Sequence, residues 1–313
     1  MSIERLPIYE MSICARVSWQ AHSLSNAGSN GSNRTMPRRQ LLADGTETDA
    51  CSGNIAKHHH AALLTEIFEQ SGVYLCPACS ARDGRRAAAL VENGKSNIRI
   101  DEALLCGLCD AHGFLVTGRR AKSDGEEDRS RLSKHTLIDF AMTLALPTCF
   151  HESKQLYTRS GNGAGEGQML MTMPSRSGQY ATIVRYKSVG VGVDTDRWRV
   201  VITDEGERLR RHQAIIRGLA DQLLSPTGAM TSKLLPHLSD LAGAIVIRTT
   251  AGRAPLYSPL VDNFIDELQK LQRDDCLIFS FRSVSEFNQA MEDLHDRSYP
   301  AVYGHTSGEK KAR

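Results

Sequence analysis

The feature that most constrains the fold is an alternating run near the start of the chain. Apolar residues occupy every second position from Tyr9 to Trp19, and the residues between them, such as Glu10, Ser12 and Arg16, are mostly polar. A period of two is typical of a β-strand with one face on a hydrophobic core. The other face must then meet water or a polar partner. The sequence therefore predicts a core strand with one polar face.

A polar segment without acidic residues follows this strand. Positions 11 to 43 contain four arginines and neither Asp nor Glu. The formal net charge of the chain is only +2, so affinity for an anion must come from local patches of this kind. The segment therefore predicts a local site for a polyanion, with nucleic acid as the leading ligand. We expect the next stretch, 43–49, to form a surface turn.

A helix is predicted next, capped by Ser52 or Asn54, ending near Gln70 and stopped by Gly72. Its expected apolar stripe consists of Ile55, Ala62, Leu63 and Ile67. Its first turns carry the basic residues Lys57, His58, His59 and His60. Because the N-terminus of a helix favours negative charge, this end of the helix adds to the predicted anion site.

Two CxxC pairs predict a metal site. The first pair is Cys76 and Cys79, the second is Cys106 and Cys109, and 26 residues separate the pairs. Each pair directs two thiolates at one point, and four thiolates form the closed tetrahedral site of a structural zinc. His112 is a reserve ligand. Coincidental burial and redox activity remain alternatives, whereas a catalytic zinc is disfavoured because four thiolates leave no open coordination position.

The second half of the chain predicts a strand from His135 that ends at Pro147, and then a hairpin. The hairpin pairs a strand over 168–173 with a return over 179–189. Methionines at alternate positions, with arginines on both sides, suit an arm laid over nucleic acid. The alternative is that these methionines pack inside the protein.

Later elements predict an α+β fold with an antiparallel sheet. We expect strands over 198–203, 242–248 and 276–281, and helices over 207–224, 260–272 and 283–296.

There is no Walker A loop, no GxGxxG after a strand and no HExxH motif in the sequence. No window approaches the about 20 apolar residues of a membrane span. The start, MSIERLPIYEMSI, does not resemble a signal peptide, so we expect a cytoplasmic protein without membrane partners.

Five features in order resemble one known family. They are a strand ending at 19–22, the motif HSLSNAGSNGSNR, the helix start SGNIAKHHHAALL, the run LCGLCDAHGFLV and the later RSGQYATIVRY. Together they resemble the DevR-type backbone subunit of type I CRISPR Cascade complexes, within the CRISPR-associated RAMP superfamily. The resemblance covers most of the chain and is strongest up to about Tyr186. One departure is the absence of an aromatic RNP-type sequence.

The resemblance implies a fold with three parts. These are an RRM-like (ferredoxin-like) palm, a zinc-containing finger insertion and a β-hairpin thumb. The first part of the palm, with its RNA-binding loop, corresponds to 1–70, the finger with its four-cysteine zinc site to 71–134, and a palm strand to 135–150. The thumb corresponds to 151–180, the remainder of the palm to 181–300, and a disordered tail to 301–313.

The resemblance also implies a function without catalysis. Such a subunit binds CRISPR guide RNA (crRNA), forms a filament with further copies of itself and joins other Cascade subunits in the prokaryotic cytoplasm. It meets target DNA through the guide. The RNA contacts carried over to this sequence are His22, Ser23, Asn26, Asn33, Arg34, Lys57, His58, Arg159, Met171, Met173 and Arg176. The zinc ligands are Cys76, Cys79, Cys106 and Cys109.

Two other functions remain as alternatives. The first is a metal-dependent endoribonuclease of the same superfamily, with His22 or His58 as general base or Asp49 as an assisting acid. The second is a zinc-ribbon regulator that binds duplex DNA through the CxxC segment. The regulator is disfavoured because this segment lacks an amphipathic recognition helix.

Overall fold

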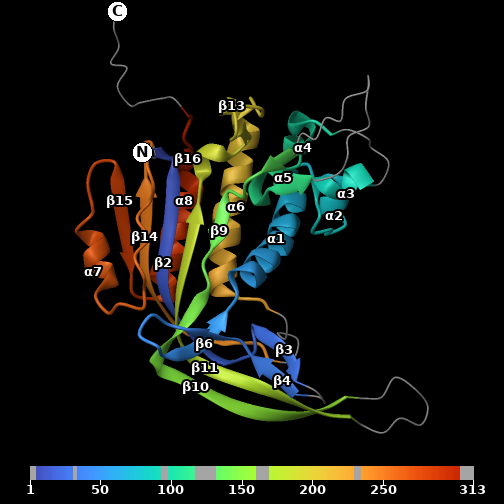
Figure 1. The fold of residues 1–313 in the computed structure, drawn as a ribbon. Coiled ribbons are helices and arrows are strands. Elements are labelled where there is room, and N and C mark those ends of the chain that lie inside the picture. Colours follow the sequence, from blue (N-terminus) through green and yellow to red (C-terminus); the bar gives the residue numbers. More distant parts are fainter. Residues whose placement is uncertain are drawn as a thin grey trace, which may run out of the picture.

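The computed structural model describes residues 5–30, 34–92, 98–116, 132–159, 169–228 and 234–303. Its largest sheet has the strand order β15-β14-β2-β11-β10-β6-β5 (Figure 1). The strands are β2 (Glu10–His22), β5 (Arg39–Leu41), β6 (Glu47–Cys51), β10 (Thr143–Arg159), β11 (Met169–Tyr186), β14 (His237–Arg248) and β15 (Cys276–Phe281). Each pair along this path is antiparallel. Short strands β3 (Asn26–Asn30), β4 (Arg34–Pro37) and β9 (Ile138–Phe140) attach beside it.

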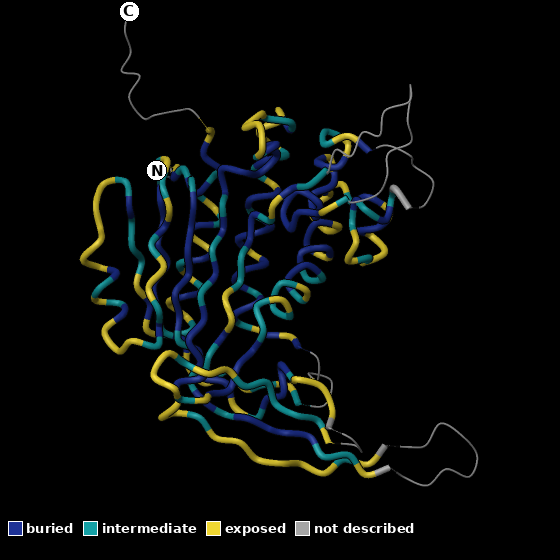
Figure 2. Tube along the Cα trace, viewed as in Figure 1, coloured by how far each residue is buried: buried dark blue, intermediate teal, exposed yellow. Residues whose placement is uncertain are grey.

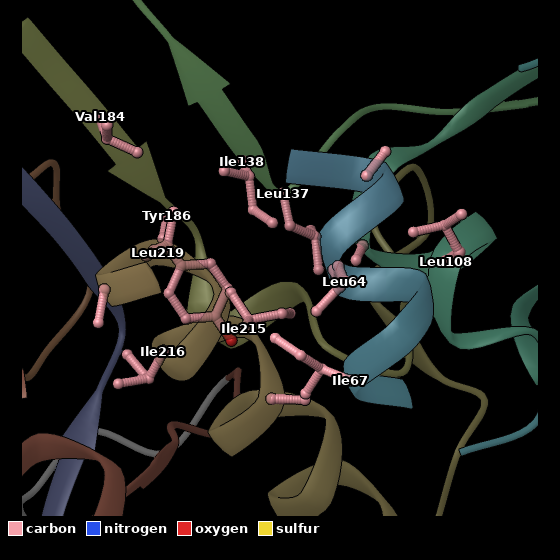
Figure 3. Close-up of a cluster of buried hydrophobic side chains, with 14 of the residues drawn as sticks. Leu64, Ile67, Leu108, Leu137, Ile138, Val184, Tyr186, Ile215, Ile216 and Leu219 are labelled. Atoms are coloured by element: carbon pink, nitrogen blue, oxygen red, sulfur yellow. The ribbon is translucent and has the colours of Figure 1, made fainter. Parts of the chain in front are cut away.

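Three helices lie on the core-facing side of the sheet and pack against one another: α1 (Gly53–Gln70), α6 (Glu205–Leu224) and α8 (Val284–Arg297). Ile13 of β2 belongs to the same buried cluster as Leu64 of α1 and Ile216 of α6. Figure 3 shows part of this core, where side chains from α1, α6, β9 and β11 meet. Helices and a largely antiparallel sheet agree with the expected α+β class.

The polar face of β2 meets another part of the same chain. The Ser12 hydroxyl donates to the carbonyl oxygen of Pro255 at 2.7 Å, and Arg16 Nε donates to that of Pro259 at 2.6 Å. The short helix α7 (Phe264–Gln269) packs against β14 and β15 beside this segment. The polar partner that the sequence predicted for this face of β2 is therefore the segment 254–262, which covers Ser12 and Arg16.

The segment that carries the CxxC pairs folds beside α1. It contains α2 (Pro77–Ser80), α3 (Ala87–Glu92), α4 (Ile100–Leu105), α5 (Gly107–His112), β7 (Phe114–Val116) and β8 (Leu132–Lys134). The carboxylate of Asp110 on α5 accepts hydrogen bonds from Lys134 Nζ at 2.5 Å and from Arg211 Nη1 of α6 at 3.2 Å. All three side chains are buried, so they anchor α5 to the rest of the molecule.

The long hairpin is built differently from the sequence prediction. Strand β10 continues through Pro147 to Arg159, and β11 is one strand from Met169 to Tyr186 that pairs with β10. The register shifts between Ala145 and Phe150, so Pro147 lies at an irregularity where its missing N–H breaks no regular ladder. The predicted stop at Pro147 and the predicted hairpin between 168–173 and 179–189 are therefore wrong.

Other local predictions also fail. The expected turn over 43–49 runs into β6, where Thr48 and Asp49 are fully buried. Helix α1 has the predicted bounds, but of the expected apolar stripe only Ile67 is buried, and the buried face otherwise consists of His60, Ala61, Leu64, Thr65 and Phe68. The strand expected over 198–203 is reduced to β13 (Arg199–Val200), and the helix expected over 260–272 to α7.

The remaining elements are short. Strand β1 (Leu6–Ile8) pairs in parallel with β16 (Ser298–Pro300), β12 (Val193–Asp194) pairs with β13, and η1 (Ser188–Gly190) is a single 3₁₀ turn. Within the described ranges no helix is both long and apolar enough to cross a membrane. The predicted tail lies outside the described residues from position 304 onward.

Candidate metal centre and nucleic-acid interface

The four cysteines of the CxxC pairs converge on one point. All four sulfur atoms lie within 4.8 Å of one another, and all four residues are buried. The Sγ atoms of Cys76 and Cys109 are 3.9 Å apart, and those of Cys79 and Cys109 are 3.6 Å apart. Ligands about 2.3 Å from a tetrahedral zinc are separated by about 3.8 Å. The group can therefore hold a metal ion of this kind.

The local backbone explains this convergence. Cys76 and Cys106 each stand immediately before a short helix, and the second cysteine of each pair lies within that helix. The backbone N–H of Gly107 donates to the carbonyl oxygen of Tyr74 at 2.8 Å, so the two turns are joined directly. Hydrogen bonds from the other three thiols lower the pKa of Cys76. The hydrogen bond with Cys109 likewise lowers the pKa of Cys106, so thiolate, the form that binds metal, is favoured at two of the four positions.

His112 belongs to a different contact. Its Nε2 atom lies 2.9 Å from Nδ1 of His60 on α1, and both rings are buried. The metal-binding group in the described part of the chain contains the four cysteines and not this histidine. His112 therefore joins the finger to α1 and does not act as the reserve ligand that the sequence suggested.

An open groove of about 570 Å³ lies where α1 meets the finger. It is lined by Lys57 of α1, by Arg86 and His112 of the finger, and by His135, and none of its described lining residues is acidic. The Nε atom of Arg86 and the Nδ1 atom of His112 are buried without a hydrogen-bond partner among the described residues. The groove thus presents donors and positive charge to its interior.

The electrostatics of the groove favour an anion. Burial, and then the nearby guanidinium of Arg86, lower the pKa of Lys57. Burial also holds the pKa of His112 well below its ordinary value, and the positive charges of Arg86 and Lys57 lower it further. Asp139 acts on Lys57 in the opposite direction but is hydrogen-bonded to Arg185 at 2.5 Å. Two cations held together without a buried partner are stabilised by a bound anion.

The loop residues carried over from the family lie partly inside the protein. His22 Nε2 lies 2.7 Å from the Tyr180 hydroxyl, which donates to Asp49 at 2.9 Å. Arg176 Nη1 lies 3.3 Å from the other oxygen of Asp49, and Arg176 also donates to the Ser25 carbonyl oxygen at 2.7 Å. His22, Asp49 and Arg176 are fully buried. In this arrangement they hold the base of the hairpin together.

The other predicted contacts are distributed over the loop, α1 and the hairpin. Ser23 and Met173 are buried; Asn26, Lys57 and Met171 are half-buried; Arg34 and His58 are exposed. Asn33 and the side chain of Arg159 lie outside the described residues. Met173 therefore packs inside the protein, which was the alternative prediction for the hairpin methionines. Lys57 lies in the groove with Arg86, while Arg34 is on β4, which pairs with β11 at Thr172. RNA contact by any of these residues stays a prediction.

The hairpin presents two different surfaces. Residues of β10 from Pro147 to Leu156 are nearly all exposed, whereas β11 from Met173 to Arg176 is buried (Figure 2). Leu156 and Leu170 are 66% and 55% exposed and lie diagonally on one face of the hairpin. The face that carries Met171 and Met173 turns toward the body of the protein.

Sequence reasoning missed two residues that shape these sites. Arg86 reaches the groove from a turn in which its φ angle is +54°, a conformation that local sequence does not predict for arginine. Tyr180 connects His22 to Asp49 across strands that are distant in sequence. The alternation of Tyr180 with Thr182 and Val184 along the predicted strand could have indicated that these three residues share one face. It could not have indicated that the Tyr180 hydroxyl bonds to His22 and Asp49.

One of three comparisons with known proteins identifies a family. The family model described as CRISPR-associated negative auto-regulator DevR/Csa2 matches residues 13–269. No curated protein matches the chain. A solved structure described as "CRISPR RNA-guided surveillance complex, pre-nicking" is 10% identical with a TM-score of 0.47, and the match covers 90% of this chain and 99% of that one. Another, "CRISPR RNA-guided surveillance complex", is 10% identical with a TM-score of 0.46 and 86% coverage of each chain. Because the family model spans most of the 313 residues, the chain belongs to the DevR/Csa2 family of CRISPR-associated proteins.

Proposed function

We propose that this chain is a guide-RNA-binding subunit that lines up with further copies along crRNA as the backbone of a type I Cascade complex. In this function the subunit holds the spacer for pairing with target DNA. The observation that carries the proposal is the groove where α1 meets the finger, which brings Lys57 and Arg86 together with no acidic residue among its described lining. Membership of the DevR/Csa2 family supports the CRISPR context.

The strand order supports an RRM-like palm. The elements β2, α1, β9 with β10, β11, α6 and β14 follow one another as β-α-β-β-α-β. In space β14 lies beside β2, β2 beside β11, and β11 beside β9 and β10, all antiparallel. This connectivity is that of the ferredoxin-like fold. Because segment 254–262 covers Ser12 and Arg16 of β2, RNA would bind at the groove and the hairpin and not on an open sheet face.

The RNA backbone is the part of the ligand that the groove suits. A phosphate is an anion with several acceptor oxygens, and Lys57 and Arg86 supply charge and donor groups around one space. None of these groups is placed to distinguish one base from another. Binding without sequence preference is what a subunit repeated along a guide requires.

The β10–β11 hairpin is the proposed thumb. It extends from the sheet past β3 and β4, on the side of the molecule away from the finger (Figure 1). The buried network of His22, Tyr180, Asp49 and Arg176 fixes its base. A hairpin with a rigid base and exposed outer strand can lie over a bound nucleic acid or a neighbouring copy.

We propose that the subunit is not an enzyme. Two of the candidate catalytic residues, His22 and Asp49, are fully buried and connected through the Tyr180 hydroxyl. Burial lowers the pKa of His22 to about 3, so the ring is neutral and lacks access to substrate. We further propose that the ion held by the four cysteines is Zn²⁺ in a structural role. When bound, it supplies a cross-link between the two CxxC turns.

Charge reversal tests the RNA-binding function. We expect the double variant Lys57→Glu with Arg34→Glu to lose the RNA that co-purifies with the native complex, because it replaces local attraction with repulsion. The measurement is the amount of RNA per protein, by absorbance and gel, after purification at low salt.

A matched control separates local from global charge. The double variant Arg5→Glu with Arg282→Glu changes the net charge equally, and both side chains are exposed. Arg282 lies at the end of β15, on the edge of the sheet away from the finger (Figure 1). This control should retain RNA. Full RNA content in the Lys57→Glu, Arg34→Glu variant would show that the groove is not the binding site.

A further inference from the structure

We propose that metal binding by the four cysteines controls the RNA groove, so that metal and RNA phosphate stabilise each other on the protein. The inference rests on the proposed RNA-binding function and concerns the regulation of the same site. It assigns Arg86 as the positioning residue through which the metal acts.

The finger supplies two of the groove's charged or donor groups. Arg86 follows Cys79 by seven residues, and His112 follows Cys109 by three. Lys57 comes from α1, outside the finger. The geometry of the groove therefore depends on how the two CxxC turns are held relative to α1.

Arg86 bridges the two halves of the finger. Its Nη1 atom donates to the carbonyl oxygen of Gly113 at 3.1 Å, and Gly113 directly follows the helix that carries Cys109. The turn that leads to Arg86 contains two non-glycine residues at positive φ, Arg82 at 58° and Arg86 at 54°. Such backbone persists only when its surroundings hold it in place. Here the surroundings are the two halves of the metal-binding segment.

The two halves of the finger are anchored unequally. The second half is joined to the rest of the protein by the buried pairs of Asp110 with Lys134 and Arg211. The first half is joined to α1 by the pair of Arg82 and Glu66, whose side chains are 55% and 50% exposed. Exposed ion pairs stabilise weakly. Metal ligation by both CxxC pairs therefore adds a cross-link to the two hydrogen bonds that join the first half to the second, from the Gly107 N–H to the Tyr74 carbonyl oxygen and from Arg86 Nη1 to that of Gly113.

The buried apolar residues of the first half do little to replace this attachment. Apart from the cysteines they are Val73, Ala78, Ala87 and Ala89, whereas the larger Leu104, Leu108 and Phe114 belong to the second half. Alanine buries little apolar area, so the hydrophobic contribution to the folding of the first half is small. Loss of metal should thus release the first half and withdraw Arg86 from the groove.

Thermodynamic linkage makes the effect reciprocal. If metal raises the affinity for RNA by holding Arg86 beside Lys57, bound RNA must raise the affinity for metal by the same factor. A factor of about tenfold is typical of such coupling. His112 should contribute little to it, because its helix is anchored by Asp110 independently of the metal.

The experiment uses the full chain loaded with Zn²⁺ and a fluorescein-labelled oligouridine. RNA affinity is measured by anisotropy before and after treatment with a chelator. We expect chelation to weaken binding about tenfold in the natural sequence, and Arg86→Ala to weaken the zinc-loaded form by a similar factor. In Arg86→Ala, chelation should then have little further effect. Arg99→Ala is the matched control, because this arginine of the finger is exposed and does not line the groove, and it should behave like the natural sequence.

A second arm does not need a folded metal-free protein. The rate of zinc extraction by excess chelator is followed with and without saturating oligouridine. Because RNA is expected to bind the zinc-loaded form more tightly, it should slow extraction in the natural sequence and in Arg99→Ala, but not in Arg86→Ala. Failure of the zinc-loaded protein to bind RNA overturns the proposed function and the linkage with it. RNA binding that is indifferent to zinc, with extraction indifferent to RNA, overturns the linkage alone.

Discussion

Individual polar side chains at the base of the β10–β11 hairpin are held inside the protein as neutral or paired groups. Since the Tyr180 hydroxyl donates to Asp49, its oxygen accepts from His22 Nε2, and His22 is the neutral tautomer that carries its proton there. Burial raises the pKa of Asp49, and Arg176 opposes that rise. These residues determine where the hairpin begins, and so they support the proposed RNA-binding surface without lying on it.

The neutral state of His22 predicts a dependence of stability on pH. The ordinary histidine pKa of 6.5 is lowered by burial to about 3 in the folded protein. Above pH 6.5 both states are neutral, and His22 has no effect. Below it the unfolded chain binds a proton that the folded chain does not, so stability falls as pH decreases toward 3. At pH 5 this single residue should cost about 2 kcal/mol.

Urea unfolding at pH 7 and pH 5 measures this cost. The variant His22→Gln keeps an N–H donor for the Tyr180 oxygen but cannot be protonated. Its loss of unfolding free energy between the two pH values should be smaller than that of the natural sequence by about 2 kcal/mol. Equal losses in the two proteins would show that His22 is protonated in the folded state.

Single elements differ in how far the sequence determines them. Strand β15 has its predicted bounds, and α1, α6 and α8 are within two residues of theirs, because each has its own apolar period and end signals. The metal group was predictable because ligand spacing is a local property. The pairing of β10 with β11 was not, since it depends on contacts across the hairpin and on an irregularity at Pro147. The position of Arg86 in the groove could not be predicted either, because it depends on a turn with an unusual positive φ angle.

At the turn that ends α5, adding one methyl group to Gly113 should destabilise the protein. Gly113 has φ +69°, and a Cβ there would lie 2.3 Å from the carbonyl oxygen of Lys134 and 2.8 Å from the backbone nitrogen of Thr136. The variant Gly113→Ala should therefore lower the free energy of unfolding by about 2 kcal/mol. It should also speed zinc extraction, because it displaces the end of the helix that carries Cys109.

Gly84→Ala is the matched control within the finger. A Cβ at Gly84 meets no atom within 4 Å, and its φ is outside the positive range. Urea unfolding and zinc extraction should be close to those of the natural sequence. If Gly113→Ala behaved like Gly84→Ala in both measurements, this turn would not pack closely against the backbone of Lys134 and Thr136.

At the scale of the whole molecule, attraction to a polyanion is expected from a local cationic groove and not from the net charge. A net charge of +2 for 313 residues gives weak general attraction to a polyanion. Many surface arginines are also paired with acids, as Arg210 is with Glu207 and Arg297 with Asp293. The groove of Lys57 and Arg86 differs because none of the described residues that line it is acidic. Recognition of RNA should therefore be confined to a few phosphate contacts on each copy.

This confinement predicts how salt affects RNA binding. For single strands, the slope of log K against log salt concentration changes by about 0.7 for each phosphate that is neutralised. If the Lys57 ammonium neutralises one phosphate, Lys57→Ala should make the slope shallower by about 0.7, as well as weakening binding. The measurement is oligouridine affinity of the zinc-loaded protein over a series of KCl concentrations.

Arg282→Ala is the control for the salt series, because this exposed side chain removes an equal charge far from the groove. Its slope should equal that of the natural sequence. A Lys57→Ala protein with weaker binding but an unchanged slope would mean that Lys57 stabilises the groove without touching phosphate. In that case the ionic contact would have to come from Arg86, whose own variant would then carry the change in slope.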